Sequence, residues 1–230
     1  MSEIAVIIGV GSGLSAALAR RFAADGMRVA LAARDMGKLA PLAQETGAQA
    51  FACDASDPAA VDGLFAAVDQ ALGPPDIVVY NASYRVRGPL IDLDPAEVAR
   101  TIEVCAFGGF LVVQAAARAM LPRGHGSILL TGASAGVKGY ARSAPFAMGK
   151  FALRGLAQSA ARELAPQGIH VAHFVIDGMI RSARFPGKGD GSGDDTLEPE
   201  AIAETYLQIH RQKRSAWSWE VELRPWVETF

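Results

Sequence analysis

The chain has 230 residues, of which half are hydrophobic and one fifth are charged, and its formal net charge is −2. This length suits one substantial hydrophobic core and is short for two ordinary domains, so we expect a single domain over residues 1–230. The near-neutral charge favours a small-molecule substrate over nucleic acid or an anionic membrane surface.

Cys53 and Cys105 lie in hydrophobic segments and show no metal-binding spacing. We therefore expect neither a disulfide nor a metal site, and a reducing, cytoplasmic location. From Met1 the chain runs directly into the apolar residues Ile4–Ile8, and no apolar stretch reaches roughly 18 uninterrupted residues, which predicts neither secretion nor a membrane span.

Short β-branched runs alternate with longer Ala- and Leu-rich segments of helical periodicity. This alternation predicts a Rossmann-type, doubly wound α/β fold, with a seven-stranded parallel sheet and helices on both faces. The expected strands are Ile4–Gly9, Met27–Ala33, Gln49–Cys53, Asp76–Tyr80, Ser127–Thr131, Ile169–Ile176 and Ser218–Leu223. The expected helices are Gly13–Ala24, Met36–Glu45, Pro58–Leu72, Pro95–Met120, Ala144–Ala165 and Glu198–Arg211.

The segment Pro186–Asp195 interleaves glycines with charged residues, so it is too polar to pack and too glycine-rich to be rigid. We predict a mobile loop over about residues 184–197. Long loops in compact domains are usually functional or disordered, so a substrate lid and a surface insertion without a role both remain open.

The first strand leads into Gly9-Val10-Gly11-Ser12-Gly13-Leu14-Ser15, and an amphipathic helix follows. Such a strand–turn–helix directs free N–H groups and the positive end of the helix dipole at one point, which suits the pyrophosphate of a dinucleotide. Ser15 stands where a third glycine would ease packing of the helix on the strand. The residues that we assign to this part of the cofactor site are Gly9, Gly11, Ser12, Gly13 and Leu14.

Arg34 follows the second expected strand, about twenty residues beyond the glycines, where the adenosine ribose of a dinucleotide is recognised. An acidic residue there would bind the ribose 2′-hydroxyl, whereas a cation would accept a 2′-phosphate. The sequence therefore favours NADP(H) over NAD(H). Asp35 stays open as a ribose ligand if the strand ends one residue later.

With the glycine turn, the segments Cys53-Asp54, Tyr80-Asn81-Ala82-Ser83, Phe146–Lys150 and Asp177-Gly178 occur in an order that resembles the short-chain dehydrogenase/reductase family almost end to end. The resemblance implies that Asp54, with Ala55 beside it, faces the adenine and that Asn81 and Ala82 hold the sheet edge next to the cofactor. Asp177 and Gly178 would correspond to the family's Pro-Gly turn near the nicotinamide.

The catalytic positions differ from the family pattern. Family members use a Tyr-x-x-x-Lys pair, in which the lysine lowers the pKa of the tyrosine so that it can exchange a proton with the substrate, together with a polarising Ser and a relay Asn. Here those positions hold Phe146, Lys150, Ala133 and Cys105, so only the lysine is retained. The chain is identified as a divergent member that lacks the Ser-Tyr pair.

Several residues could substitute for the missing groups. Ser134 lies one residue beyond Ala133, and Tyr84 and Tyr140 could enter the pocket from loops as replacement acids; each could equally be a turn or surface residue. Ser143 falls at the Tyr-x6-Lys spacing of enoyl reductases. Lys150 would also donate hydrogen bonds to the nicotinamide ribose.

We expect Cys105 to be a buried, inert thiol and His173 to be a satisfied core residue. The C-terminal stretch Trp217–Trp226 alternates apolar with polar residues and predicts an edge strand, paired either across subunits or within its own subunit. Family members commonly form dimers or tetramers, so the resemblance implies a homodimer or homotetramer.

Two functions follow. The first is an oxidoreductase that transfers a hydride to or from a small apolar carbonyl or alkene, with Lys150, a loop tyrosine or water providing the proton. The alternative is a catalytically silent NADP(H)-binding module.

Overall fold

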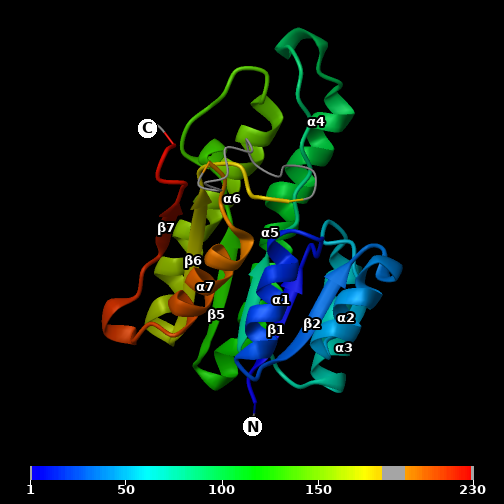
Figure 1. The fold of residues 1–230 in the computed structure, drawn as a ribbon, viewed down its shortest axis with the longest axis vertical. Helices are drawn as coiled ribbons and strands as arrows, with labels where there is room; N and C mark the ends of the chain where they lie inside the picture. The colour runs from blue at the N-terminus through cyan, green and yellow to red at the C-terminus, as the bar shows by residue number, and fades with distance from the viewer. Residues whose placement is uncertain (1, 183–194, 229–230) are drawn as a thin grey trace.

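The computed structural model describes residues 2–182 and 195–228. Seven strands form one sheet in the order β3-β2-β1-β4-β5-β6-β7, and every neighbouring pair is parallel (Figure 1). This arrangement confirms the predicted fold class. The strands are β1 (Ile4–Ile8), β2 (Arg28–Ala33), β3 (Gln49–Ala52), β4 (Ile77–Tyr80), β5 (Gly126–Thr131), β6 (Ile169–Ile176) and β7 (Glu220–Leu223).

Helices cover both faces of the sheet, and each face has its own hydrophobic core. The α-helices are α1 (Leu14–Ala24), α2 (Ala40–Thr46), α3 (Pro58–Ala71), α4 (Pro95–Ile102), α5 (Gly108–Met120), α6 (Ala144–Leu164) and α7 (Pro199–His210). Alternate residues of β1 contribute to the two cores: Ile4, Val6 and Ile8 pack with α3, α5 and α6, whereas Ala5 and Ile7 pack with α1, α2 and α7.

The helix starts follow local chemistry. Asp57 and Asp94 accept hydrogen bonds from the backbone N–H groups of Ala59 and Ala96, each at 2.9 Å, and a proline occupies the first turn of both α3 and α4.

Two expected helices are interrupted. The segment expected as one helix over Met36–Glu45 begins as a 3₁₀ helix, η1 (Met36–Leu39), before α2. The segment expected over Pro95–Met120 contains a π-helical turn at Glu103–Phe107, which separates α4 from α5. The extra residue in this wide turn places Cys105 against the backbone of Tyr84, whose N–H and C=O lie 3.4 and 3.3 Å from its sulfur.

The helical run Pro95–Arg123 is long and apolar enough, by length and composition alone, to cross a membrane. Half of its most apolar window is buried inside this fold, and a core helix passes the same test, so the finding is weak support for a membrane span.

The segment between β4 and α4 projects above the carboxyl ends of the strands and carries the exposed side chains of Leu90 and Ile91 at its 3₁₀ turn (Figure 1). At one edge of the sheet, the C-terminal stretch contributes β7, which pairs with β6 of its own chain. The loop predicted over 184–197 falls mainly on residues 183–194, which lie outside the described residues.

Candidate cofactor and catalytic site

Cavities line the carboxyl edge of the sheet. The first has a volume of about 320 Å³ and extends from the end of β1 past the ends of β2, β3 and β4. It brings together residues predicted at the adenosine, namely Arg34, Asp54 and Ala55, with Asn81 and Ala82, which were predicted to hold the sheet edge beside the cofactor.

The glycine turn adjoins this cavity. Gly9 has a φ of +85°, and a Cβ there would collide with the backbone of Ala82 at the end of β4. At Gly11 and Gly13, by contrast, a Cβ would meet nothing within 4 Å. Gly13 is the N-cap of α1 and has no side chain to cap it, and this N-terminus faces a cleft of about 270 Å³ bordered by the three glycines, Leu14 and Ser15. The turn therefore fits a pyrophosphate, because its backbone can be approached closely and the helix N-terminus is not capped by a side chain of its N-cap residue, Gly13.

Ser15 connects this turn to β4, which the sequence did not indicate. Its buried hydroxyl donates to the carbonyl of Gly9 at 3.2 Å and accepts from Nδ2 of Asn81 at 2.7 Å. The residue in the place of a third glycine thus orients the Asn81 amide. Ser12 is exposed and lines an adjoining cavity beside Lys38.

Arg34 is exposed and lines the first cavity, as does Lys38. Asp35, between them in the sequence, also lines this cavity: its carboxylate accepts from the N–H of Gly37 at 3.0 Å and pairs with Lys38 at 3.4 Å. The sequence analysis did not assign Lys38 to the cofactor site. Its position four residues after Arg34, just past the end of the strand, could have indicated that it lines the same cavity.

Asp54 is fixed on the cavity wall by the hydroxyl and backbone N–H of Ser56, at 2.7 and 3.0 Å from Oδ1. These hydrogen bonds hold its pKa below the ordinary range for an aspartate. A charged, oriented acceptor therefore faces the predicted adenine position.

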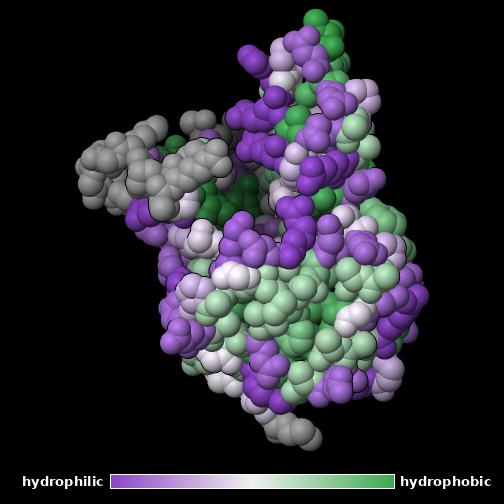
Figure 2. Space-filling model, turned by 90° about the vertical axis from the view of Figure 1, so that its right-hand side faces the viewer, coloured by the Kyte–Doolittle hydropathy of each residue, from purple (hydrophilic) through white to green (hydrophobic). Residues whose placement is uncertain are grey.

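A second cavity, of about 570 Å³, shares Asn81 and Ser83 with the first and continues along the sheet edge towards β6. Figure 2 shows this edge hollowed beneath the projecting segment, with hydrophobic side chains in the recess. The predicted residues that line the cavity are Ser134, Tyr140, Phe146, Lys150, Asp177 and Gly178, and Ala133 lies among them.

Lys150 is anchored in the wall of the second cavity. Its side chain is only 3% exposed, and Nζ donates to the carbonyl oxygen of Thr131 at the end of β5, at 2.7 Å. Burial lowers the pKa of Lys150. Phe146, one turn earlier on α6, has its ring centroid 5.7 Å from the ammonium nitrogen.

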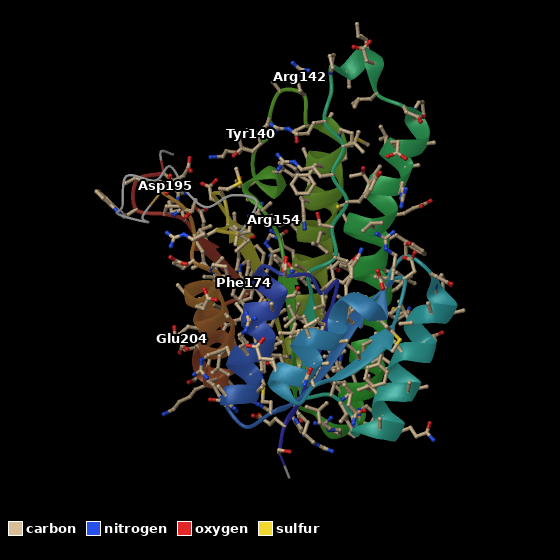
Figure 3. The ribbon with its side chains drawn as sticks, turned by 45° about the vertical axis from the view of Figure 1, so that its right-hand side comes forward. Tyr140, Arg142, Arg154, Phe174, Asp195 and Glu204 are labelled. Atoms are coloured by element: carbon tan, nitrogen blue, oxygen red, sulfur yellow. The ribbon has the colours of Figure 1, made fainter. Side chains whose placement is uncertain are left out.

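The two loop tyrosines differ in position. Tyr84 donates its hydroxyl to Oε2 of Glu97 at 2.5 Å, which raises the pKa of Tyr84, and it does not line the second cavity. Tyr140 lines that cavity from the loop between β5 and α6 (Figure 3), and its ring centroid lies 5.8 Å from Nζ of Lys138.

Ser134 begins a short 3₁₀ turn, η5 (Ser134–Gly136), on the cavity wall. Ser143 is fully buried away from the cavity, and its hydroxyl has no partner among the described residues.

At the end of β6, Asp177 lies between the cations of Lys138, at 3.6 Å, and Arg224, at 3.3 Å. Gly178 follows with a φ of +150°, and a Cβ there would lie 2.7 Å from Cδ of Pro225. Backbone conformation and crowding therefore both favour glycine at this turn.

Two buried groups lie behind this edge. His173 on β6 is fully buried, and Nδ1 contacts Oε2 of Glu220 at 3.0 Å; burial lowers the pKa of His173 to about 4. Tyr206, which sequence reasoning missed, is also fully buried: its hydroxyl contacts the Thr131 hydroxyl at 2.9 Å and its ring stacks on Phe174. Burial raises the pKa of Tyr206, which does not line the second cavity.

Within residues 2–182 and 195–228, no group of three or more His, Cys, Asp or Glu side chains could hold a metal ion.

A parallel sheet of this order, with an uncapped glycine turn after β1 and cavities along its carboxyl edge, defines a dinucleotide-binding α/β protein. The family model for short chain dehydrogenase matches residues 3–186. The chain therefore belongs to the short-chain dehydrogenase family of oxidoreductases.

Sorbitol-6-phosphate 2-dehydrogenase of Escherichia coli (strain K12) is 31% identical over 193 residues, which cover 80% of this chain and 74% of that protein. A short-chain dehydrogenase structure from Rhodopseudomonas palustris is 34% identical with a TM-score of 0.84, over 97% of this chain and 99% of that one. A metagenomic short-chain oxidoreductase in complex with NADP is 31% identical with a TM-score of 0.85, over 98% of both chains.

Proposed function

We propose that this protein transfers a hydride between NADP(H) and a carbonyl or alkene bound in the second cavity. The observation that carries the proposal is the position of Lys150. It lies buried on the wall of the second cavity, which shares Asn81 and Ser83 with the cavity that fits the adenosine half of the cofactor.

Different residues of the chain would bind different parts of the cofactor. The glycine turn and the N-terminus of α1 would hold the pyrophosphate, and Asp54 would face the adenine. Arg34 and Lys38 would accept a 2′-phosphate, which favours NADP(H), the cofactor in the metagenomic neighbour. Lys150, Asp177 and Gly178 would border the nicotinamide. When bound, that ring supplies or accepts the hydride.

We propose that Phe146, Ala133 and Cys105 occupy the positions of the family's Tyr, Ser and Asn, so another group must exchange the proton. Tyr140 is the better candidate, because it lines the cavity next to Lys138, whereas Tyr84 is held by Glu97 outside it. A positioned acid contributes roughly 10²- to 10⁴-fold, so correct orientation of the substrate alone could still leave measurable rates.

A silent NADP(H)-binding module is the second candidate. One observation favours it: the guanidinium carbon of Arg85 lies 4.9 Å from the ring centroid of Phe146, so a cation covers the ring that stands in place of the acid.

Steady-state oxidation of NADPH, measured with a panel of small ketones, aldehydes and enones, tests the enzymatic function. We expect the parent protein to exceed a Lys150→Ala variant by at least tenfold on one substrate or more. Calorimetric titration of NADPH runs alongside as the control. A parent that binds NADPH yet oxidises it no faster than the variant would contradict the enzyme and support the module.

We also propose a cytoplasmic homodimer or homotetramer. Phe107 and Phe110 beside α5, and Met148 and Phe151 on α6, expose large apolar surfaces, although both helices otherwise pack into the core. Sedimentation equilibrium would give the mass of the assembly.

A further inference from the structure

Arg85 and Arg87 lie on the wall of the second cavity, on the segment that follows β4. Both side chains are exposed. Within the described residues, no carboxylate oxygen lies within 4.0 Å of a nitrogen of either guanidinium. Two neighbouring arginines therefore face one concave space, and neither has an acidic partner in the part of the chain that the structure describes.

Arg85 is held in place by a ring. Its guanidinium carbon lies 4.9 Å from the ring centroid of Phe146, a cation–π contact that uses no hydrogen-bond acceptor. Although the side chain is exposed overall, the partial desolvation of its guanidinium, followed by the positive charge of Arg87, lowers the pKa of Arg85. The guanidinium is thus oriented by packing, and the fork of donors that suits a carboxylate or a phosphate has no carboxylate partner among the described residues.

The other charges of the cavity do not cancel these two. Asp177 is already paired with Lys138 and Arg224. Among the described residues that line the cavity, Glu228 is the other carboxylate, and its single negative charge does not match the two positive charges of Arg85 and Arg87. The apolar residues Ile176, Met179 and Ile180 line the same cavity and provide room for a carbon chain.

We propose that the substrate of this site is an anionic carbonyl compound, whose carboxylate or phosphate group is bound by Arg85 and Arg87. This inference rests on the proposed oxidoreductase function and names its substrate class. It departs from the small apolar substrate expected from the sequence, because the two arginines come from a loop that local patterns did not assign to the pocket.

Binding to the protein loaded with NADP⁺ tests the proposal, with two pairs of probes that differ in their charge. Acetoacetate is compared with methyl acetoacetate, and dihydroxyacetone phosphate with dihydroxyacetone, each by calorimetric titration. We expect at least one anion to bind about tenfold or more tightly than its neutral partner, since hydrogen bonds to charged groups are the stronger kind. The preferred anion then distinguishes a carboxylate from a phosphate.

Variants assign the preference to residues. Arg85→Met and Arg87→Met should each weaken binding of the anion by about tenfold and leave the neutral partner unchanged. Arg118→Met removes the same charge from the far half of α5, where the side chain is 66% exposed, and should change nothing. Because Arg87→Met leaves the contact between Arg85 and Phe146 intact, it keeps the test valid if Arg85→Met disturbs folding.

The outcomes separate the two proposals. Normal NADP⁺ binding with no anion bound more tightly than its neutral partner, or with equal loss in the Arg118→Met control, overturns the anionic substrate alone. Failure of the parent to bind NADP⁺ overturns the proposed function, and this inference with it.

Discussion

Replacing Arg34 by alanine should separate the two nicotinamide cofactors. Arg34 and Lys38 both line the first cavity, and Asp35 between them is occupied by Gly37 and Lys38. An NADPH 2′-phosphate would therefore meet two cations beside one carboxylate, that of Asp35, which is paired with Lys38, whereas NADH offers only a hydroxyl there.

The expected loss of NADPH affinity in the Arg34→Ala variant depends on how exposed the Arg34 side chain is. A pair of unit charges 4 Å apart interacts by about 1 kcal/mol in water and by about 4 kcal/mol near a protein surface. Arg34 is exposed, so a charge-assisted hydrogen bond of about 1.5–3 kcal/mol is the appropriate range. Since 1.4 kcal/mol corresponds to a factor of ten, Arg34→Ala should weaken NADPH by about 10- to 100-fold. Lys38→Ala should cost less, because Asp35 already engages its ammonium.

Calorimetric titration of both cofactors measures these changes. NADH affinity should remain nearly unchanged in Arg34→Ala, and Arg118→Ala serves as a charge-matched control that should alter neither cofactor. Equal affinities of the parent for NADPH and NADH would refute the assignment of Arg34 to a 2′-phosphate.

Two further predictions concern the catalytic edge and its buried support. The triple change Phe146→Tyr, Ala133→Ser, Cys105→Asn should raise NADPH oxidation with a small ketone by about 10² or more, and Phe146→Tyr alone by less; a triple variant that binds NADPH but reduces nothing would contradict a disarmed reductase site. His173 has a pKa lowered to about 4, against about 6.5 when unfolded, so only the unfolded chain binds its proton between these values and stability falls as the pH falls. Denaturant unfolding should show that His173→Gln removes about 2 kcal/mol of the stability lost between pH 7 and pH 5, whereas a parent-like slope would argue against this residue.

Much of the fold was readable from local patterns. The observed strands begin and end within two residues of those expected. Every residue of β1 and β4 is buried, and such β-branched runs are distinctive in an all-parallel sheet. The glycine turn was equally clear, since its strand and helix flank it directly in the sequence. The breaks in helical geometry were missed: the π turn at Cys105 reflects a contact with Tyr84, which no helical periodicity encodes.

For the candidate site too, some features could be predicted from the sequence and others only from the tertiary structure. Sequence alone predicted a cofactor-binding edge and showed that no tyrosine lies four residues before Lys150, because both depend on short spacings. Only the tertiary structure decided which side chains meet there. Ser15 contacts Asn81, Asp177 lies between Lys138 and Arg224, and Arg85 covers Phe146. These partners come from different strand ends, which the parallel sheet gathers at one edge, so their contacts depend on strand order and loop path rather than on any local pattern.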